Sequence, residues 1–206
     1  MKSPLHYQVS EYDCGPTTLL NALNFLFERE EIPPDIIRNI MLYSLDCYSP
    51  EGVQGKHGTS RMAMMFLSSW FNNYGSIGRL DISSEYLTGD SVYIGETSKV
   101  NDALRRGGVV VIRLFYEVEH YVLLTGTENS HILMFDPYFN TEDFEGSDIG
   151  LSLSTIYTHN RIVPASYLNK TDESLYALGE VKKREAVIIY NNASKKSEYK
   201  TIEYFI

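Results

Sequence analysis

Hydrophobic residues recur at helical spacing in the first third of the chain. The first stripe, at i, i+3 and i+4 spacing, consists of Leu19, Leu20, Leu23 and Phe27. It predicts a helix from Cys14 to about Glu28, because this spacing places apolar side chains on one helix face. Pro16 falls in the first turn of that segment, where the N–H that proline lacks has no intrahelical partner.

Two further helices are expected before residue 76. One is predicted over 34–45, again with proline at its start. The next follows Thr59 and Ser60, which are good N-cap residues, and its apolar positions are Met62, Met65, Phe66 and Trp70. Gly75 is expected just beyond its end, since glycine often terminates helices.

The pattern changes to short apolar runs after residue 91. A helix capped by Thr97 or Ser98 and ended by Gly107 interrupts these runs. The run 109–115 is almost continuously apolar, which is typical of a strand buried on both faces. Strands are expected at 92–94, 109–115, 120–125, 132–135, 186–190 and 199–205. These patterns predict an α+β fold in one domain over 1–206, with a helical lobe over about 1–90 and a sheet lobe over about 91–206.

The charge balance narrows the range of partners. The chain has 206 residues, 43% of them hydrophobic, and a net charge of -9. Such a surface repels phosphate backbones, so nucleic-acid binding is not expected. No stretch approaches the roughly 18 apolar residues of a membrane span, and the N-terminus lacks the apolar segment of a signal peptide. We therefore expect a cytoplasmic protein without an integral membrane segment.

The two cysteines suggest chemistry rather than cross-linking. Cys14 and Cys47 are far apart and form no CxxC pair, so a disulfide framework or a zinc knuckle is not expected. In a reducing compartment a free thiol can serve as a nucleophile. We expect Cys47, which has no candidate base nearby in the sequence, to be structural.

Cys14 stands at the expected start of the first helix. Unpaired N–H groups and the helix dipole favour negative charge there, and therefore favour a thiolate. The N–H of Cys14 can also donate to an oxyanion, and the side-chain amide of Gln8 is a candidate second donor. The alternative is that Cys14 is an ordinary buried helix residue.

A candidate base and its orienter come from two neighbouring strands. His120 is expected to open one strand, and Asp136 to close the next. If the two strands pair as antiparallel neighbours, the carboxylate of Asp136 lies beside the imidazole and fixes its tautomer. Taken singly, each residue has an ordinary interpretation, an edge-strand histidine and an Asp-Pro turn. Together with Gln8 and Cys14 they form the set that a cysteine hydrolase requires.

These motifs resemble the C39 peptidases, the double-glycine leader peptidases of peptide-exporting transporters. The cysteine motif of that family is similar to Gln8 followed by Asp13-Cys14-Gly15, and its histidine motif to His120-Tyr121-Val122-Leu123 followed by Asp136-Pro137. The similarity spans about residues 5–137. It is specific at the two motifs and vague between them, and residues after 140 do not resemble the usual end of the family domain.

The resemblance implies a papain-like fold and a cysteine peptidase of stand-alone form. It implies that Cys14 is the nucleophile, His120 the base, Asp136 its orienter and Gln8 an oxyanion donor, with cleavage after Gly-Gly in a leader peptide. A peptide or protein is then the substrate and partner. Two alternatives stay open: an amidase or transpeptidase with the same residues, and a peptide-binding module with an inactive site.

Three minor expectations complete the set. His57, in a glycine-rich loop, is a candidate for the cleft wall, and Asp13 is expected to cap the first helix. His6, His131 and His159 have no partners at metal-ligand spacing, so neither a metal nor another cofactor is expected. The oligomeric state is not predicted.

Overall fold

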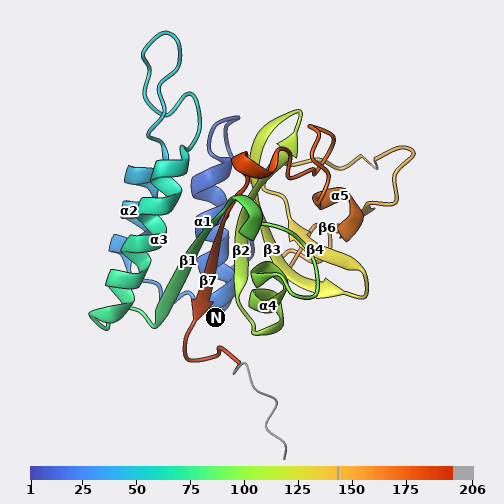
Figure 1. Ribbon diagram of the computed structural model, residues 1–206. Coiled ribbons are helices and arrows are strands. Elements are labelled where there is room, and N and C mark those ends of the chain that lie inside the picture. Colours follow the sequence, from blue (N-terminus) through green and yellow to red (C-terminus); the bar gives the residue numbers. More distant parts are fainter. Residues whose placement is uncertain (143, 197–206) are drawn as a thin grey trace, which may run out of the picture.

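The centre of the molecule is one antiparallel sheet of seven strands, in the order β1-β7-β2-β3-β4-β6-β5 (Figure 1). This computed structural model describes residues 1–142 and 144–196. The strands are β1 (Ile82–Thr88), β2 (Val109–Tyr116), β3 (Val118–Glu128), β4 (His131–Phe135), β5 (Gly150–Leu151), β6 (Arg161–Pro164) and β7 (Glu185–Asn191). Helices and an antiparallel sheet in one chain confirm the expected α+β class.

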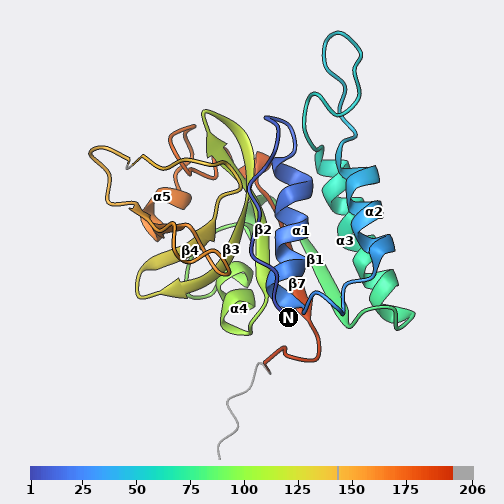
Figure 2. The same cartoon turned by 180° about the vertical axis from the view of Figure 1, so that it is seen from behind.

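Helices cover both faces of this sheet. On one face lie α1 (Cys14–Leu26), α2 (Pro34–Ser44) and α3 (Arg61–Ser76), while α4 (Lys99–Arg105) and the short α5 (Ala165–Leu168) pack on the other. Figure 2, from the opposite side, shows α1 in front of the strands that partly cover it in Figure 1. Two 3-10 turns complete the elements, η1 (Gly89–Ser91) and η2 (Val181–Lys183). In the described residues, none of these helices is long and apolar enough to cross a membrane.

Strand β2 explains why the sheet needs two helical layers. Val109 and Val111 pack toward α1, whereas Val110, Ile112 and Leu114 join the core on the α4 side. Successive side chains of a strand point to opposite faces, so an unbroken apolar run has to be covered twice. The expectation that 109–115 is buried on both faces is confirmed.

Several boundaries differ from the sequence prediction. The run 92–94 is not a strand, although Val92 and Ile94 are buried. The edge strand beside β7 is β1 (82–88), which lies in the stretch assigned to the helical lobe. Its polar, half-buried side chains hide the strand from a search for apolar runs. The short strands β5 and β6 were not predicted, and the strand expected at 199–205 lies outside the described residues.

Gly75 has a different role from the one expected. It lies inside α3 and does not follow its end. A Cβ at this position would stand 2.0 Å from the carbonyl oxygen of Ile82. The glycine therefore lets α3 approach the start of β1. At the other end of the helix the expectation holds, because the Ser60 side chain accepts from Ala63 N at 3.1 Å.

Gly75→Ala is expected to lower the free energy of unfolding by about 1–3 kcal/mol, because the added methyl forces α3 and β1 apart. Helix propensity alone predicts the opposite, a gain of about 1 kcal/mol. Denaturant unfolding measures the difference, with Asn73→Ala on the exposed side of α3 as the control. A stabilised Gly75→Ala protein would contradict the close approach.

Candidate active site

Cys14 is the first residue of α1 and is only 7% exposed. Its N–H belongs to the first turn, where backbone donors have no partner within the helix. A buried hydrogen bond fixes this end of the helix to the sheet, since Thr18 Oγ1 donates to Tyr121 O at 3.0 Å. This bond fixes the helix that carries Cys14 relative to the strand that carries His120.

His120 lies in β3, but it is the third residue of the strand and does not open it. The strand begins at Val118, after a tight turn in which Glu117 adopts a φ of 63°. The imidazole is 6% exposed. It is therefore held in a dry environment, in which hydrogen bonds are stronger than in water.

The structure brings Asp136 beside His120, as antiparallel pairing of their strands predicted. Strands β3 and β4 pair in antiparallel register, with a bulge between Leu124 and Gly126. His120 Nε2 lies 2.7 Å from Asp136 Oδ1, and the carboxylate is completely buried. Because Nε2 faces Asp136, Nδ1 is the ring nitrogen left for the thiol of Cys14.

The ring of His120 interacts with both neighbours. Burial by itself would lower its pKa, but the hydrogen bond to Asp136 and the neighbouring thiol of Cys14 outweigh burial and raise the pKa from 6.5 to about 10. The imidazole is therefore protonated at neutral pH and loses this proton only as the pH rises toward 10. A protonated imidazole next to the thiol stabilises a thiolate by direct charge attraction.

Gln8 lies on the extended segment that runs past the end of β4. Its backbone N–H donates to Pro137 O at 2.8 Å, directly after Asp136. Its side-chain Nε2 donates to Ser10 O at 2.9 Å, and its Oε1 is buried without a partner among the described residues. An amide nitrogen carries two hydrogens, so one N–H of Gln8 remains for a substrate.

Asp13 does not cap α1 with its side chain, although it occupies the N-cap position. Its carboxylate accepts instead from Val9 N at 3.1 Å and from Ser10 N at 2.8 Å. An N-cap side chain usually accepts from the N–H groups in the first turn of its helix. In this protein the turn over 9–12 offers backbone N–H groups that the Asp13 carboxylate binds instead. The carboxylate of Asp13 thus shapes the turn that leads from Gln8 to Cys14.

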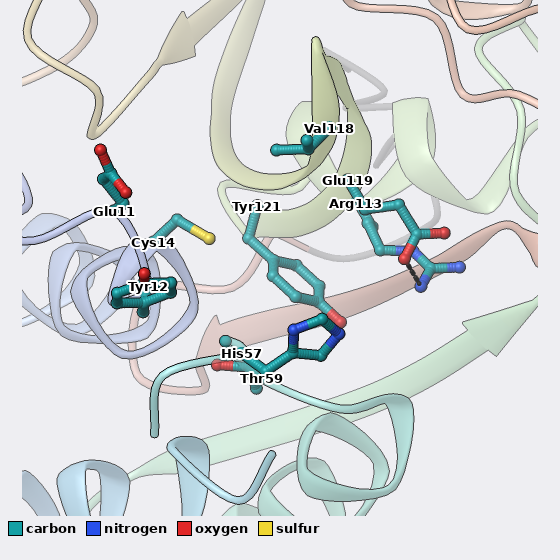
Figure 3. A pocket seen from close by; sticks show the side chains of 10 residues that line it. Glu11, Tyr12, Cys14, His57, Thr59, Arg113, Val118, Glu119 and Tyr121 are labelled. Carbon is teal, nitrogen blue, oxygen red and sulfur yellow. Dashed lines mark hydrogen bonds and ion pairs between the residues drawn. The ribbon is translucent and has the colours of Figure 1, made fainter. Parts of the chain in front are cut away.

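A cleft of about 420 Å³ opens beside Cys14 (Figure 3). The sulfur points toward the space between Tyr121 and the 57–59 loop. His57 lines this cleft, as expected, and Glu11 and Tyr12 form its other wall. His120 does not line it. The thiol of Cys14 lies at the edge of the cleft.

The 57–59 loop is held at its base. It belongs to the connection between α2 and α3, which projects from the body of the molecule in Figures 1 and 2. Asp46, near the start of the connection, accepts from Ser60 N at 2.9 Å and also from the Ser60 hydroxyl. This clamp ties both ends of the connection together and keeps His57 at the cleft.

A buried carboxylate supports the far wall of the cleft. Glu185 is 1% exposed and accepts from Tyr121 Oη at 2.9 Å and Tyr86 Oη at 2.7 Å. Its charge is balanced by Arg113 Nε at 3.1 Å, and more distantly by Arg61 Nε at 3.6 Å. A buried charge is tolerated only when it is paired and hydrogen-bonded, and these contacts hold Tyr121 and Arg113 in place.

Cys47 differs from Cys14 in its surroundings. Burial and the neighbouring carboxylate of Asp46 raise the pKa of the Cys47 thiol, and a higher pKa makes a thiol less reactive. Among the described residues, no group of three His, Cys, Asp or Glu side chains is placed to hold a metal ion.

Sequence reasoning missed the residues that hold the candidate set together. Asn21 is one: its side chain exchanges two 2.8 Å hydrogen bonds with the backbone of His6, and so fixes the segment carrying Gln8 against α1. Thr18 and Glu185 are others. A polar residue on the apolar stripe of a helix is a weak signal for such a role, and it applies to Thr18 and Asn21.

No protein-family model matches this chain, and comparison with curated proteins found no match. The geometry of the site offers a thiol at a helix N-terminus, an imidazole and a buried carboxylate in series.

Cys14 is expected to react with iodoacetamide at about pH 6.5 at least roughly tenfold faster than Cys47, because His120 favours its thiolate. Mass spectrometry of the folded protein after brief exposure measures both rates. His120→Ala should remove the difference while leaving Cys47 unchanged. Equal rates for the two cysteines in the folded wild-type protein would refute an activated thiol.

Proposed function

We propose that the chain is a papain-like cysteine peptidase related to the C39 peptidases. Cys14 is the nucleophile, His120 the acid and base, Asp136 the orienter and Gln8 an oxyanion donor. The observation that carries the proposal is the contact between His120 and the buried Asp136 at 2.7 Å, together with the influence of the Cys14 thiol on the same ring. Such a series supplies a nucleophile and a proton carrier together.

The reaction follows from this arrangement. The Cys14 thiolate attacks an amide carbonyl carbon, and the carbonyl oxygen becomes an oxyanion held by the N–H of Cys14 and by Gln8. The imidazolium of His120 gives its proton to the leaving amine as the C–N bond breaks, which leaves a thioester on Cys14. Neutral His120 then takes a proton from water, the resulting hydroxide attacks the thioester, and thiolate and imidazolium are restored.

The substrate we propose is a peptide with Gly-Gly before the scissile bond. This preference rests on the resemblance to leader peptidases. The cleft at Cys14, about 420 Å³, is at the small end of the range for ligand pockets, and Tyr12 and Tyr121 line it. Residues without side chains would bring the peptide backbone close to the thiol between these rings. Because the nucleophile must stay reduced, we propose the cytoplasm as its compartment.

Two other functions use the same residues differently. An amidase or transpeptidase would share the thioester and differ only in the group that accepts the acyl chain. A peptide-binding module would need the cleft but not the activated thiol. The His120–Asp136 pair favours catalysis over binding alone, because burying both groups is costly and adds nothing to peptide affinity when neither lines the cleft.

Gln8→Ala is expected to lower kcat by about 10²–10³ because it removes an oxyanion donor. Alkylation of Cys14 should stay at the wild-type rate, since Gln8 is not needed to form the thiolate. The matched control is Gln54→Ala, the same change in the connection between α2 and α3. Unchanged turnover in Gln8→Ala would show that the oxyanion is held by other donors.

Peptides ending in Gly-Gly, Gly-Ala or Leu-Leu before the scissile bond test the substrate. Release is expected to be fastest from Gly-Gly and to be abolished by Cys14→Ala. Liquid chromatography with mass detection identifies the cleaved bond, and added hydroxylamine traps a thioester as a hydroxamate, which reports acyl transfer as well as hydrolysis. Equal rates for the three peptides would contradict the Gly-Gly preference but not the peptidase.

A further inference from the structure

Residues that follow β4 in the chain hydrogen-bond both the backbone and the carboxylate of Asp136. Asn160 binds the backbone of Asp136 with two hydrogen bonds: Asp136 N donates to Asn160 Oδ1 at 2.7 Å, and Asn160 Nδ2 donates to Asp136 O at 2.8 Å. They fix the main chain that carries the carboxylate.

The two carboxylate oxygens of Asp136 have different partners. Oδ1 accepts from His120 Nε2 at 2.7 Å and from Tyr138 N at 2.8 Å. Oδ2 accepts from the hydroxyl of Tyr176 at 2.8 Å. Tyr176 is completely buried and its N–H donates to Phe115 O at 2.7 Å, which holds the ring against β2. Burial and Asp136 raise the pKa of Tyr176 well above its usual range, so its hydroxyl keeps the proton that it donates.

Arg161 extends this chain by one residue. It is the largest of the fully buried side chains, and its Nε donates to the Tyr176 hydroxyl at 3.2 Å. Its guanidinium also donates to Asn160 O at 3.0 Å and lies 5.5 Å from the ring centroid of Phe144. Arg161 forms no ion pair within the described residues. The hydroxyl of Tyr176 links its guanidinium to the carboxylate of Asp136 through two consecutive hydrogen bonds.

Burying an arginine without a direct ion pair costs desolvation free energy. In this protein the buried positive charge lies on the same hydrogen-bonded chain as the carboxylate of Asp136. Donation from Arg161 makes the Tyr176 hydroxyl a stronger donor, since hydrogen bonds in series polarise one another. Both residues stabilise the ionised form of Asp136. An ionised Asp136 leaves the shared proton on His120, and protonated His120 is the form that stabilises a thiolate at Cys14.

We propose that Tyr176 and Arg161 are positioning residues that keep Asp136 ionised and oriented, and thereby keep His120 protonated beside Cys14. This inference rests on the proposed function and assigns a role to the part of the chain after 140. Without the Tyr176 hydroxyl, Oδ2 has no donor in a site from which water is excluded. The carboxylate then competes for the proton of His120, and the neutral imidazole no longer supports the thiolate.

Other titratable side chains lie near the His120–Asp136 pair. Cys14 faces His120 from α1, and Tyr116 faces it from β2 with ring centroids 6.0 Å apart. Tyr138 follows β4 and stacks on Tyr116 at 5.2 Å. Burial and the charge of Asp136 raise the pKa of Tyr116, so this phenol is neutral at neutral pH. The hydroxyl of Tyr116 makes no hydrogen bond to Asp136, which makes it a matched control.

The experiment measures the alkylation rate of Cys14 against pH and needs no substrate. In Tyr176→Phe the midpoint of the profile is expected to rise by about one pH unit, the effect of losing one hydrogen bond to a charged group. Tyr116→Phe removes the same atom from the same aromatic cluster and should leave the profile at its wild-type position. Arg161→Lys, which retains a buried cation, should shift it less than Tyr176→Phe. Circular dichroism and thermal unfolding verify that each variant is folded.

The outcomes separate this inference from the proposed function. If wild-type Cys14 reacts no faster than Cys47, the proposed nucleophile fails, and the positioning role falls with it. If wild-type Cys14 is activated but a folded Tyr176→Phe protein has the same pH profile of alkylation as the wild type, only the positioning role is wrong. Equal shifts in Tyr176→Phe and Tyr116→Phe would indicate a general packing effect and also overturn it.

A second measurement uses the unmodified protein and does not depend on a variant that folds. The Tyr176 hydroxyl proton, bonded to a buried carboxylate, should appear in the NMR spectrum as a slowly exchanging signal with nuclear Overhauser contacts to the His120 ring. A Tyr176 hydroxyl that exchanges as fast as an exposed phenol would overturn the proposal.

Discussion

The hydrogen bond between the buried carboxylate of Asp136 and the imidazole of His120 is the interaction on which the rest of the site depends. Two ionisable groups are removed from water at this point, which is unfavourable unless every polar atom finds a partner. Both oxygens of Asp136 and its backbone N–H and C=O are bonded. Satisfying them requires contributions from strands and loops distant in sequence, so the chain has to fold completely before the pair exists.

The site is assembled from three separate parts of the chain, and one or two hydrogen bonds connect each pair of parts. Thr18 ties α1 to β3 beside His120, and Gln8 ties the N-terminal segment to Pro137 beside Asp136. Asn21 closes the triangle by binding the N-terminal segment to α1. None of these links uses the side chain of a candidate catalytic residue. They therefore fix the backbone around the site without occupying its candidate side chains.

Buried polar groups divide between the two faces of the sheet. Glu185 lies on the α1 side, where it stabilises the cleft wall through Tyr121, while Arg161 and Tyr176 support Asp136 from the other side. Strand β3 connects the two networks, because its neighbouring residues His120 and Tyr121 point to opposite faces. One strand thus carries the candidate base on one side and the cleft wall on the other.

Hydrophobic periodicity by itself determined that α1, α2 and α3, the strands β2, β3, β4 and β7, and the α+β class are present, although not where each element ends, because these elements bury long apolar stripes. Local motifs indicated Cys14, His120 and Asp136, since thiols, imidazoles and carboxylates at element ends are chemically distinctive. The edge strand β1, the position of Gly75 inside α3 and the bonding of Asp13 to its own turn depended on neighbours that are not local in sequence. Only the tertiary structure decided which residues surround Asp136, because Asn160, Arg161 and Tyr176 are 24 to 40 positions away along the chain, and no periodic pattern records a contact between single polar side chains.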